Sequence, residues 1–143
     1  AMSNAALAAG TTPRAAEALL AVASAERDRG ATVAAEGAYQ RILDTPTSSP
    51  RVQALAYKGL ADLRQETVGN DELARYRYRQ AAAVLERVAR QPGSEQTWAL
   101  TTLGEVQETL GDPDGAVASY ARAAASSPDA DGDYPASRLA QVL

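Results

Sequence analysis

The sequence predicts an all-α fold built from helical hairpins, and three observations lead to that prediction. Hydrophobic residues make up 45% of the 143 residues but aromatic residues only 5%, and alanine supplies most of the apolar residues by number. Small side chains let helices approach closely, which favours helix-on-helix packing over a sheet sandwich. Proline and glycine divide the chain into segments of helix length. No segment alternates apolar and polar residues with the period of two that a half-buried strand requires.

The expected helix boundaries follow from capping residues and helix breakers. Thr12-Pro13, Ser49-Pro50 and Asp112-Pro113 each place a polar capping residue before a proline at the first helical position. Thr32 and Ser94 are expected to cap two further helices. Neighbours joined by such short turns pack antiparallel. Seven helices are therefore expected, over residues 13–30, 32–44, 50–68, 71–90, 94–111, 113–127 and 135–143.

The first six expected helices form three pairs that share an internal spacing. In each pair, a bulky and a small residue mark the first helix, and a small residue and a larger one mark the second. The third pair has Leu100, Leu103-Gly104, Leu110-Gly111, Ala116, Tyr120, Ala123 and Pro128 at these positions. The first pair has Leu19, Val22-Ala23, Gly30, Ala35, Tyr39 and Ile42. The middle pair is the loosest, with Tyr57, Leu60-Ala61 and a late Gly69, then Ala81, Leu85 and Val88 in a lengthened helix.

This spacing resembles the tetratricopeptide repeat family, whose unit is a helix–turn–helix of about 34 residues. The resemblance implies an all-α, right-handed helical-hairpin solenoid of about three repeats, over residues 16–49, 54–93 and 97–130. A C-terminal capping helix at 135–143 is expected to cover the last repeat. Residues 1–12 are expected to be a flexible lead or a remnant of cloning, and residues 13–143 one repeat domain.

Charge and composition argue against several classes of function. The net charge of -4 disfavours nucleic-acid binding, which depends on clustered Lys and Arg. No apolar run reaches the roughly 20 residues needed to span a bilayer, so we expect no direct membrane insertion and a soluble protein of the cytoplasm or periplasm. The chain has no Cys and no His, so the usual zinc ligands and the commonest general base are missing. We expect no enzyme activity, no metal and no cofactor.

The resemblance also implies a binding face. In the family, the first helices of successive pairs line the concave face, where ligands usually lie. The matching positions here are mixed and somewhat acidic, which predicts a mild preference for basic or apolar ligands. The alternative is that they are ordinary solvated positions. They are Glu17, Leu20, Ser24, Arg27 and Asp28 in the first pair, Leu55, Lys58, Asp62, Gln65 and Glu66 in the second, and Trp98, Thr101, Glu105, Glu108 and Thr109 in the third.

Trp98 is the only tryptophan and a candidate anchor for a partner. Thr101 and Thr102, one helical turn further on, are polar, which predicts that Trp98 lies off the core stripe of Leu100 and Leu103. An exposed tryptophan on a binding face is a typical source of binding energy. The alternative is that the ring fills the core beside the preceding long helix.

Some tetratricopeptide domains hold the C-terminal carboxylate of a chaperone tail with paired Lys and Asn residues. The corresponding positions here are Leu20, Ser24, Asp62 and Thr101, and only the neighbouring Lys58 is basic. We therefore expect no recognition of chaperone tails.

Two hypotheses for the function stay open on the sequence. The first is a protein–protein interaction scaffold whose concave face binds a partner peptide or protein segment. The alternative is a structural spacer or self-association module within a larger protein or assembly, in which case the partner is another copy of the chain.

Overall fold

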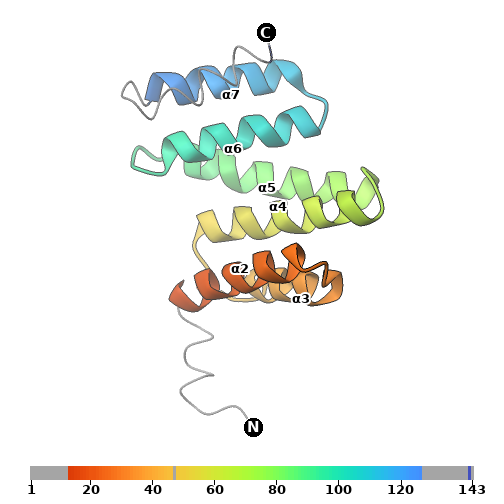
Figure 1. The fold of residues 1–143 in the computed structure, drawn as a ribbon. Helices are drawn as coiled ribbons and strands as arrows, with labels where there is room; N and C mark the ends of the chain where they lie inside the picture. The colour runs from red at the N-terminus through yellow and green to blue at the C-terminus, as the bar shows by residue number, and fades with distance from the viewer. Residues whose placement is uncertain (1–12, 47, 127–141, 143) are drawn as a thin grey trace. The chain divides into compact units, whose positions relative to one another are not determined.

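The computed structural model describes residues 13–46, 48–126 and 142, and within them it contains helices and no strand. The predicted all-α class is confirmed. The six helices of the described residues fall within two residues of the expected starts and ends (Figure 1). The lead at 1–12 and the capping helix expected at 135–143 lie outside the described residues, apart from Val142. The helices are α2 (Pro13–Asp28), α3 (Thr32–Leu43), α4 (Pro50–Thr67), α5 (Glu72–Arg90), α6 (Gln96–Thr109) and α7 (Pro113–Ser126).

Side-chain caps form at three of the expected helix starts, and at one of them Asp112 Oδ1 accepts a hydrogen bond from the Gly115 backbone N–H at 3.0 Å, just before α7. The Ser49 hydroxyl accepts a hydrogen bond from the Val52 backbone N–H at 3.3 Å, and Pro50 follows at the first helical position. Asp71 Oδ1 accepts from the Ala74 N–H at 3.0 Å and so caps α5. Each cap satisfies a backbone donor that has no partner within its helix.

The expected caps at Thr32 and Ser94 are wrong. Thr32 is the first residue of α3, and the capping position belongs to Ala31, which makes no side-chain hydrogen bond. Glu95 holds the capping position of α6, also without a side-chain bond. In both cases a backbone turn at the preceding glycine decides where the helix begins, since Thr32 N–H bonds the Gly30 carbonyl at 3.0 Å and Gln96 N–H bonds the Gly93 carbonyl at 3.2 Å.

The turn between α2 and α3 repeats between α6 and α7. Gly30 and Gly111 have φ angles of 77° and 79°, in the left-handed region that glycine tolerates best. In both turns the next residue closes a bond back into the helix: Ala31 N–H to the Glu26 carbonyl at 2.8 Å, and Asp112 N–H to the Gln107 carbonyl at 2.9 Å. This is the glycine termination common at helix ends. The two hairpins therefore share one turn geometry at equivalent repeat positions.

The chain divides into two compact units, Ala1–Arg77 and Tyr78–Leu143. In the first unit, α2 packs against α3, and α4 packs against both. Alanine at the contacts lets the helices approach closely, and a few larger side chains fill the remaining space. The core consists of Ala16, Ala23, Ala35, Ala38, Tyr39, Ile42, Val52, Ala56, Leu60 and Leu63, with Leu19, Leu20 and Leu43 packed against it.

In the second unit, α6 packs against α7. Tyr120 of α7 is fully buried, and its ring lies directly against Gly104 of α6. Two polar contacts join the helices: the Ser119 hydroxyl donates to Gln107 Oε1 at 2.6 Å, and the Thr97 and Ser126 hydroxyls lie 2.8 Å apart. Close approach at a glycine thus sets the separation of this hairpin.

Candidate interaction site

A hollow of about 250 Å³ lies between α2 and α4 in the first unit. Small-molecule pockets usually have volumes of about 300–1,000 Å³. The hollow is therefore suited to one or two side chains of a partner rather than to a cofactor. Its lining residues are Leu20, Ser24 and Arg27 from α2, Tyr39 from α3, and Leu55, Lys58, Gly59 and Asp62 from α4.

Tyr39 and Gly59 form the floor of the hollow. Tyr39 is 2% exposed, and its ring occupies the space that a Cβ atom on Gly59 would need. Glycine in the middle of a helix destabilises it by roughly 0.5–1 kcal/mol relative to alanine. The Tyr39 ring explains why glycine occurs at position 59, because any larger side chain there would collide with the ring.

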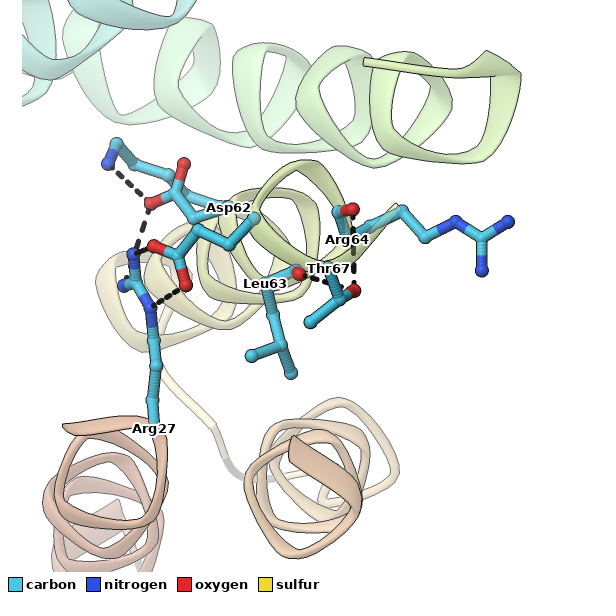
Figure 2. Close-up of polar contacts among 7 residues, drawn as sticks. Arg27, Asp62, Leu63, Arg64 and Thr67 are labelled. Carbon is cyan, nitrogen blue, oxygen red and sulfur yellow. Dashed lines mark hydrogen bonds and ion pairs between the residues drawn. The ribbon is translucent and has the colours of Figure 1, made fainter. Parts of the chain in front are cut away.

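Four charged side chains form the rim. Arg27 Nε donates to Glu66 Oε2 at 3.2 Å, and Arg27 Nη2 donates to the other oxygen of the same carboxylate. Arg27 Nη1 also lies 3.9 Å from Asp62 Oδ2, and Lys58 Nζ donates to that oxygen at 2.9 Å. Figure 2 shows Arg27 reaching from α2 to Asp62 on α4. The rim thus ties together two helices that are far apart in the sequence.

The contact between Arg27 and Glu66 favours the ionised forms of these two side chains. The hydrogen bond from Arg27 lowers the pKa of the Glu66 carboxyl below its usual value and raises the pKa of the Arg27 guanidinium. The charges of Glu66 and Asp62 add smaller effects on Arg27 in the same direction. Two cations and two anions balance at the rim, so this part of the surface lacks the acidic character that the sequence suggested.

The structure brings six of the expected binding residues together around this hollow: Leu20, Ser24, Arg27, Leu55, Lys58 and Asp62. Glu17 and Gln65, from the same two helices, are exposed but do not line it. Glu17 Oε1 instead lies 3.7 Å from Arg51 Nη1, in a third ion pair between α2 and α4.

Asp28 at the end of α2 and Glu66 on α4 are exposed and do not line the hollow, and the other expected residues are on α6, in the second unit. Trp98, Glu105 and Glu108 are half-buried there. Thr101 is 7% exposed and Thr102 8%, so the inference that these threonines mark a solvent-facing stripe is wrong. The Thr101 hydroxyl donates to the Thr97 carbonyl at 2.8 Å, which satisfies it within its own helix. Thr101 therefore presents little surface to a partner.

Sequence reasoning did not assign Tyr39 and Gly59 to the candidate site. Tyr39 matched an aromatic core position, and its second role as the floor depends on the neighbouring helix α4. Gly59 could have been identified from the sequence, because a glycine inside a strongly helical segment often marks the close approach of another group.

A second, smaller hollow of about 80 Å³ lies on another side of α4. Arg64 points to this side in Figure 2, away from Arg27. Arg64 donates to Asp71 Oδ2 from Nε at 3.0 Å and from Nη2 at 2.7 Å, and so links α4 to the cap of α5. The lining is Thr32, Glu36, Gln40, Leu60, Leu63, Arg64, Thr67, Leu73 and Arg77.

Within the described residues, no helix combines the length and apolar composition needed to cross a membrane.

A tetratricopeptide repeat family model matches residues 1–50 and 68–131. The unmatched residues 51–67 cover α4 almost entirely, and α4 supplies half of the lining of the larger hollow. No curated protein matches the chain at a significant level.

Proposed function

Because the chain belongs to the tetratricopeptide repeat family, whose repeats generally mediate protein–protein interactions, we propose that it is an interaction scaffold and that a partner segment binds over the hollow between α2 and α4. The family is typically a non-catalytic scaffold, and the proposal assigns this chain no catalytic activity. The fold class agrees with the family, an all-α array of helical hairpins.

The observation that carries the proposal is the hollow itself. It combines two half-buried leucines, Leu20 and Leu55, with a charged rim, and its floor is rigid because Tyr39 is packed against Gly59. Apolar contacts supply affinity, whereas a satisfied polar rim supplies orientation and selectivity. A preformed hollow also reduces the ordering that binding requires.

We propose Trp98, Glu105 and Glu108 on α6 as a separate contact surface of the second unit. Trp98 is half-buried, so part of a large amphipathic ring remains available to a partner.

The proposal can be tested by filling the hollow with a large side chain. Ser24 is exposed on α2 and lines the hollow, whereas the adjacent Ala25 is exposed on the same helix and does not. Peptides selected from a phage-displayed library on the immobilised chain would be measured by fluorescence polarisation against the unmodified chain, Ser24→Trp and Ala25→Trp. We expect Ser24→Trp to weaken binding by about tenfold or more, and Ala25→Trp to have little effect, because only the first tryptophan fills the hollow.

Two results would contradict the proposal. One is equal binding by both tryptophan variants. The other is that the molecular mass measured by light scattering doubles as the protein concentration is raised, while no selected peptide binds. That result would support the self-association alternative.

A further inference from the structure

Hydrogen-bond donors outnumber acceptors in the lining of the larger hollow. Arg27 and Lys58 carry donors only, and Ser24 and Tyr39 each carry a hydroxyl. Asp62 is the single carboxylate in the lining. A hollow of this composition favours a partner group that accepts hydrogen bonds and carries negative charge.

The two cations converge on one atom. Both Arg27 and Lys58 are paired with Asp62 Oδ2, and their side chains are only 30% and 28% exposed. Partial burial strengthens the field of the two cations inside the hollow relative to a fully solvated pair. Each cation carries more N–H donors than this one carboxylate oxygen accepts, and Arg27 uses two of them to bind Glu66.

Glu66 is the other carboxylate that holds Arg27, and it lies outside the lining. Its side chain is 52% exposed, against 19% for Asp62. An ion pair with an exposed partner contributes little net stability, because water screens the charges and the side chains lose freedom. Glu66 can therefore be exchanged for another carboxylate at small cost, whereas Asp62 is held in place.

We propose that the hollow binds the side-chain carboxylate of an acidic residue in the partner segment, and that Glu66 competes with this residue for Arg27. The inference rests on the proposed function, since it names the chemistry of the segment that binds there. The incoming carboxylate replaces Glu66 on the guanidinium, whose fork matches a carboxylate. Leu20 and Leu55 contact an apolar residue beside it. A basic residue would instead meet the two cations of the lining.

The experiment uses three phage pools of 11-residue peptides that carry Glu, Gln or Lys at the central position and are otherwise random. Selected peptides are synthesised with each of the three central residues. Their affinities are measured by fluorescence polarisation for the unmodified chain, Glu66→Gln, Lys58→Met and Glu36→Gln. Glu36 is an exposed acid that lines the other hollow, so its variant carries the same charge change at a site that the proposal does not involve.

We expect the Glu peptide to bind about tenfold more tightly than its Gln counterpart, and Lys58→Met to remove most of that difference. Glu66→Gln should tighten the Glu peptide by about three- to tenfold and leave the Gln peptide unchanged, because the internal competitor is gone. Glu36→Gln should change neither. Circular dichroism of each variant confirms that the helices are intact.

The possible failures are distinguishable. If Lys peptides bind best through the hollow, or if Glu66→Gln weakens the Glu peptide, the carboxylate proposal is overturned while the scaffold function stands. If no selected peptide is sensitive to Ser24→Trp, both proposals fail.

Discussion

The Tyr120 ring fills the space beside Gly104, with its Cε1 atom 2.5 Å from the point that a Cβ atom on Gly104 would occupy. Real Cβ atoms do not approach a ring so closely, so any larger residue must displace the tyrosine. Because Tyr120 is fully buried, displacing its ring disturbs the close packing around it. The glycine is therefore a packing requirement of this hairpin.

Gly104→Ala should destabilise the protein by about 1–3 kcal/mol, the usual effect of overpacking a core. The measurement is urea unfolding followed by circular dichroism. The matched control is Gly37→Ala in α3, where a Cβ atom would meet nothing within 4 Å. That change should stabilise the protein by about 0.4–1 kcal/mol, because alanine restricts the unfolded chain. A Gly104→Ala protein as stable as the Gly37→Ala protein would contradict the packing argument.

Ser49→Ala should destabilise the protein by about 1 kcal/mol, because it removes the acceptor for the Val52 N–H at the start of α4. Thr32→Ala should change stability by less than about 0.5 kcal/mol, because Thr32 makes no cap. Thermal unfolding of the two variants under one buffer condition compares them directly. Equal losses in both would show that the hydroxyl of Ser49 is not the stabilising group.

Ala23→Leu should destabilise the protein by about 1–3 kcal/mol or more, because Ala23 is fully buried in the contact of α2 with its neighbours. Ala21→Leu places the same side chain on the exposed surface of α2 and should be nearly neutral. The comparison is made by urea unfolding. If both leucines were tolerated, the close approach of the helices would not depend on alanine.

Asp71 gives a pH-dependent contribution to stability. The hydrogen bonds from Arg64, and after them the bond from the Ala74 N–H, hold the pKa of Asp71 below its ordinary value of 3.8. The folded state therefore favours the ionised form: the contribution is complete above the ordinary pKa and is lost as the pH falls through the lowered value. Asp71→Asn keeps an acceptor for the cap and removes only the charge.

We therefore expect the melting temperature of the unmodified protein to exceed that of Asp71→Asn by a small amount at pH 7, and the difference to vanish towards pH 2. High salt at pH 7 should reduce the difference, because the pair is exposed to solvent. A difference that stays constant from pH 7 to pH 2 would exclude a role for the charge.

The helix order was predictable because its signals act over a few residues. Proline after a polar cap and glycine after a helix act on the backbone next to them, so α4 begins at Pro50 as expected, and α2 and α6 end just before Gly30 and Gly111. The capping residues of α3 and α6 were predicted wrongly for the same local reason, because the turn geometry at Gly30 and Gly93 overrides the preference of a nearby hydroxyl residue.

The candidate site was predictable only in outline. The family resemblance implied that Leu20 and Leu55 share one face, and they do line one hollow. The partner of Arg27 is 39 residues away, and no local pattern specifies that pairing. Polarity was a poor guide on α6, where Thr101 is buried with its hydroxyl satisfied by a carbonyl of its own helix. Charges counted without their partners suggested an acidic face, whereas the rim of the hollow is balanced.

Arg27, near the end of α2, makes structural contacts through both its backbone and its side chain. Its backbone carbonyl accepts from the Gly30 N–H at 3.0 Å and so fixes the turn, while its guanidinium reaches the rim on α4. The main chain is thus anchored at the residue whose side chain is proposed to change partners. An exchange of one carboxylate for another then needs only rotation about side-chain bonds, and such rotations in accessible residues take picoseconds to nanoseconds. Recognition at this surface would be limited by encounter with the partner, not by rearrangement of the scaffold.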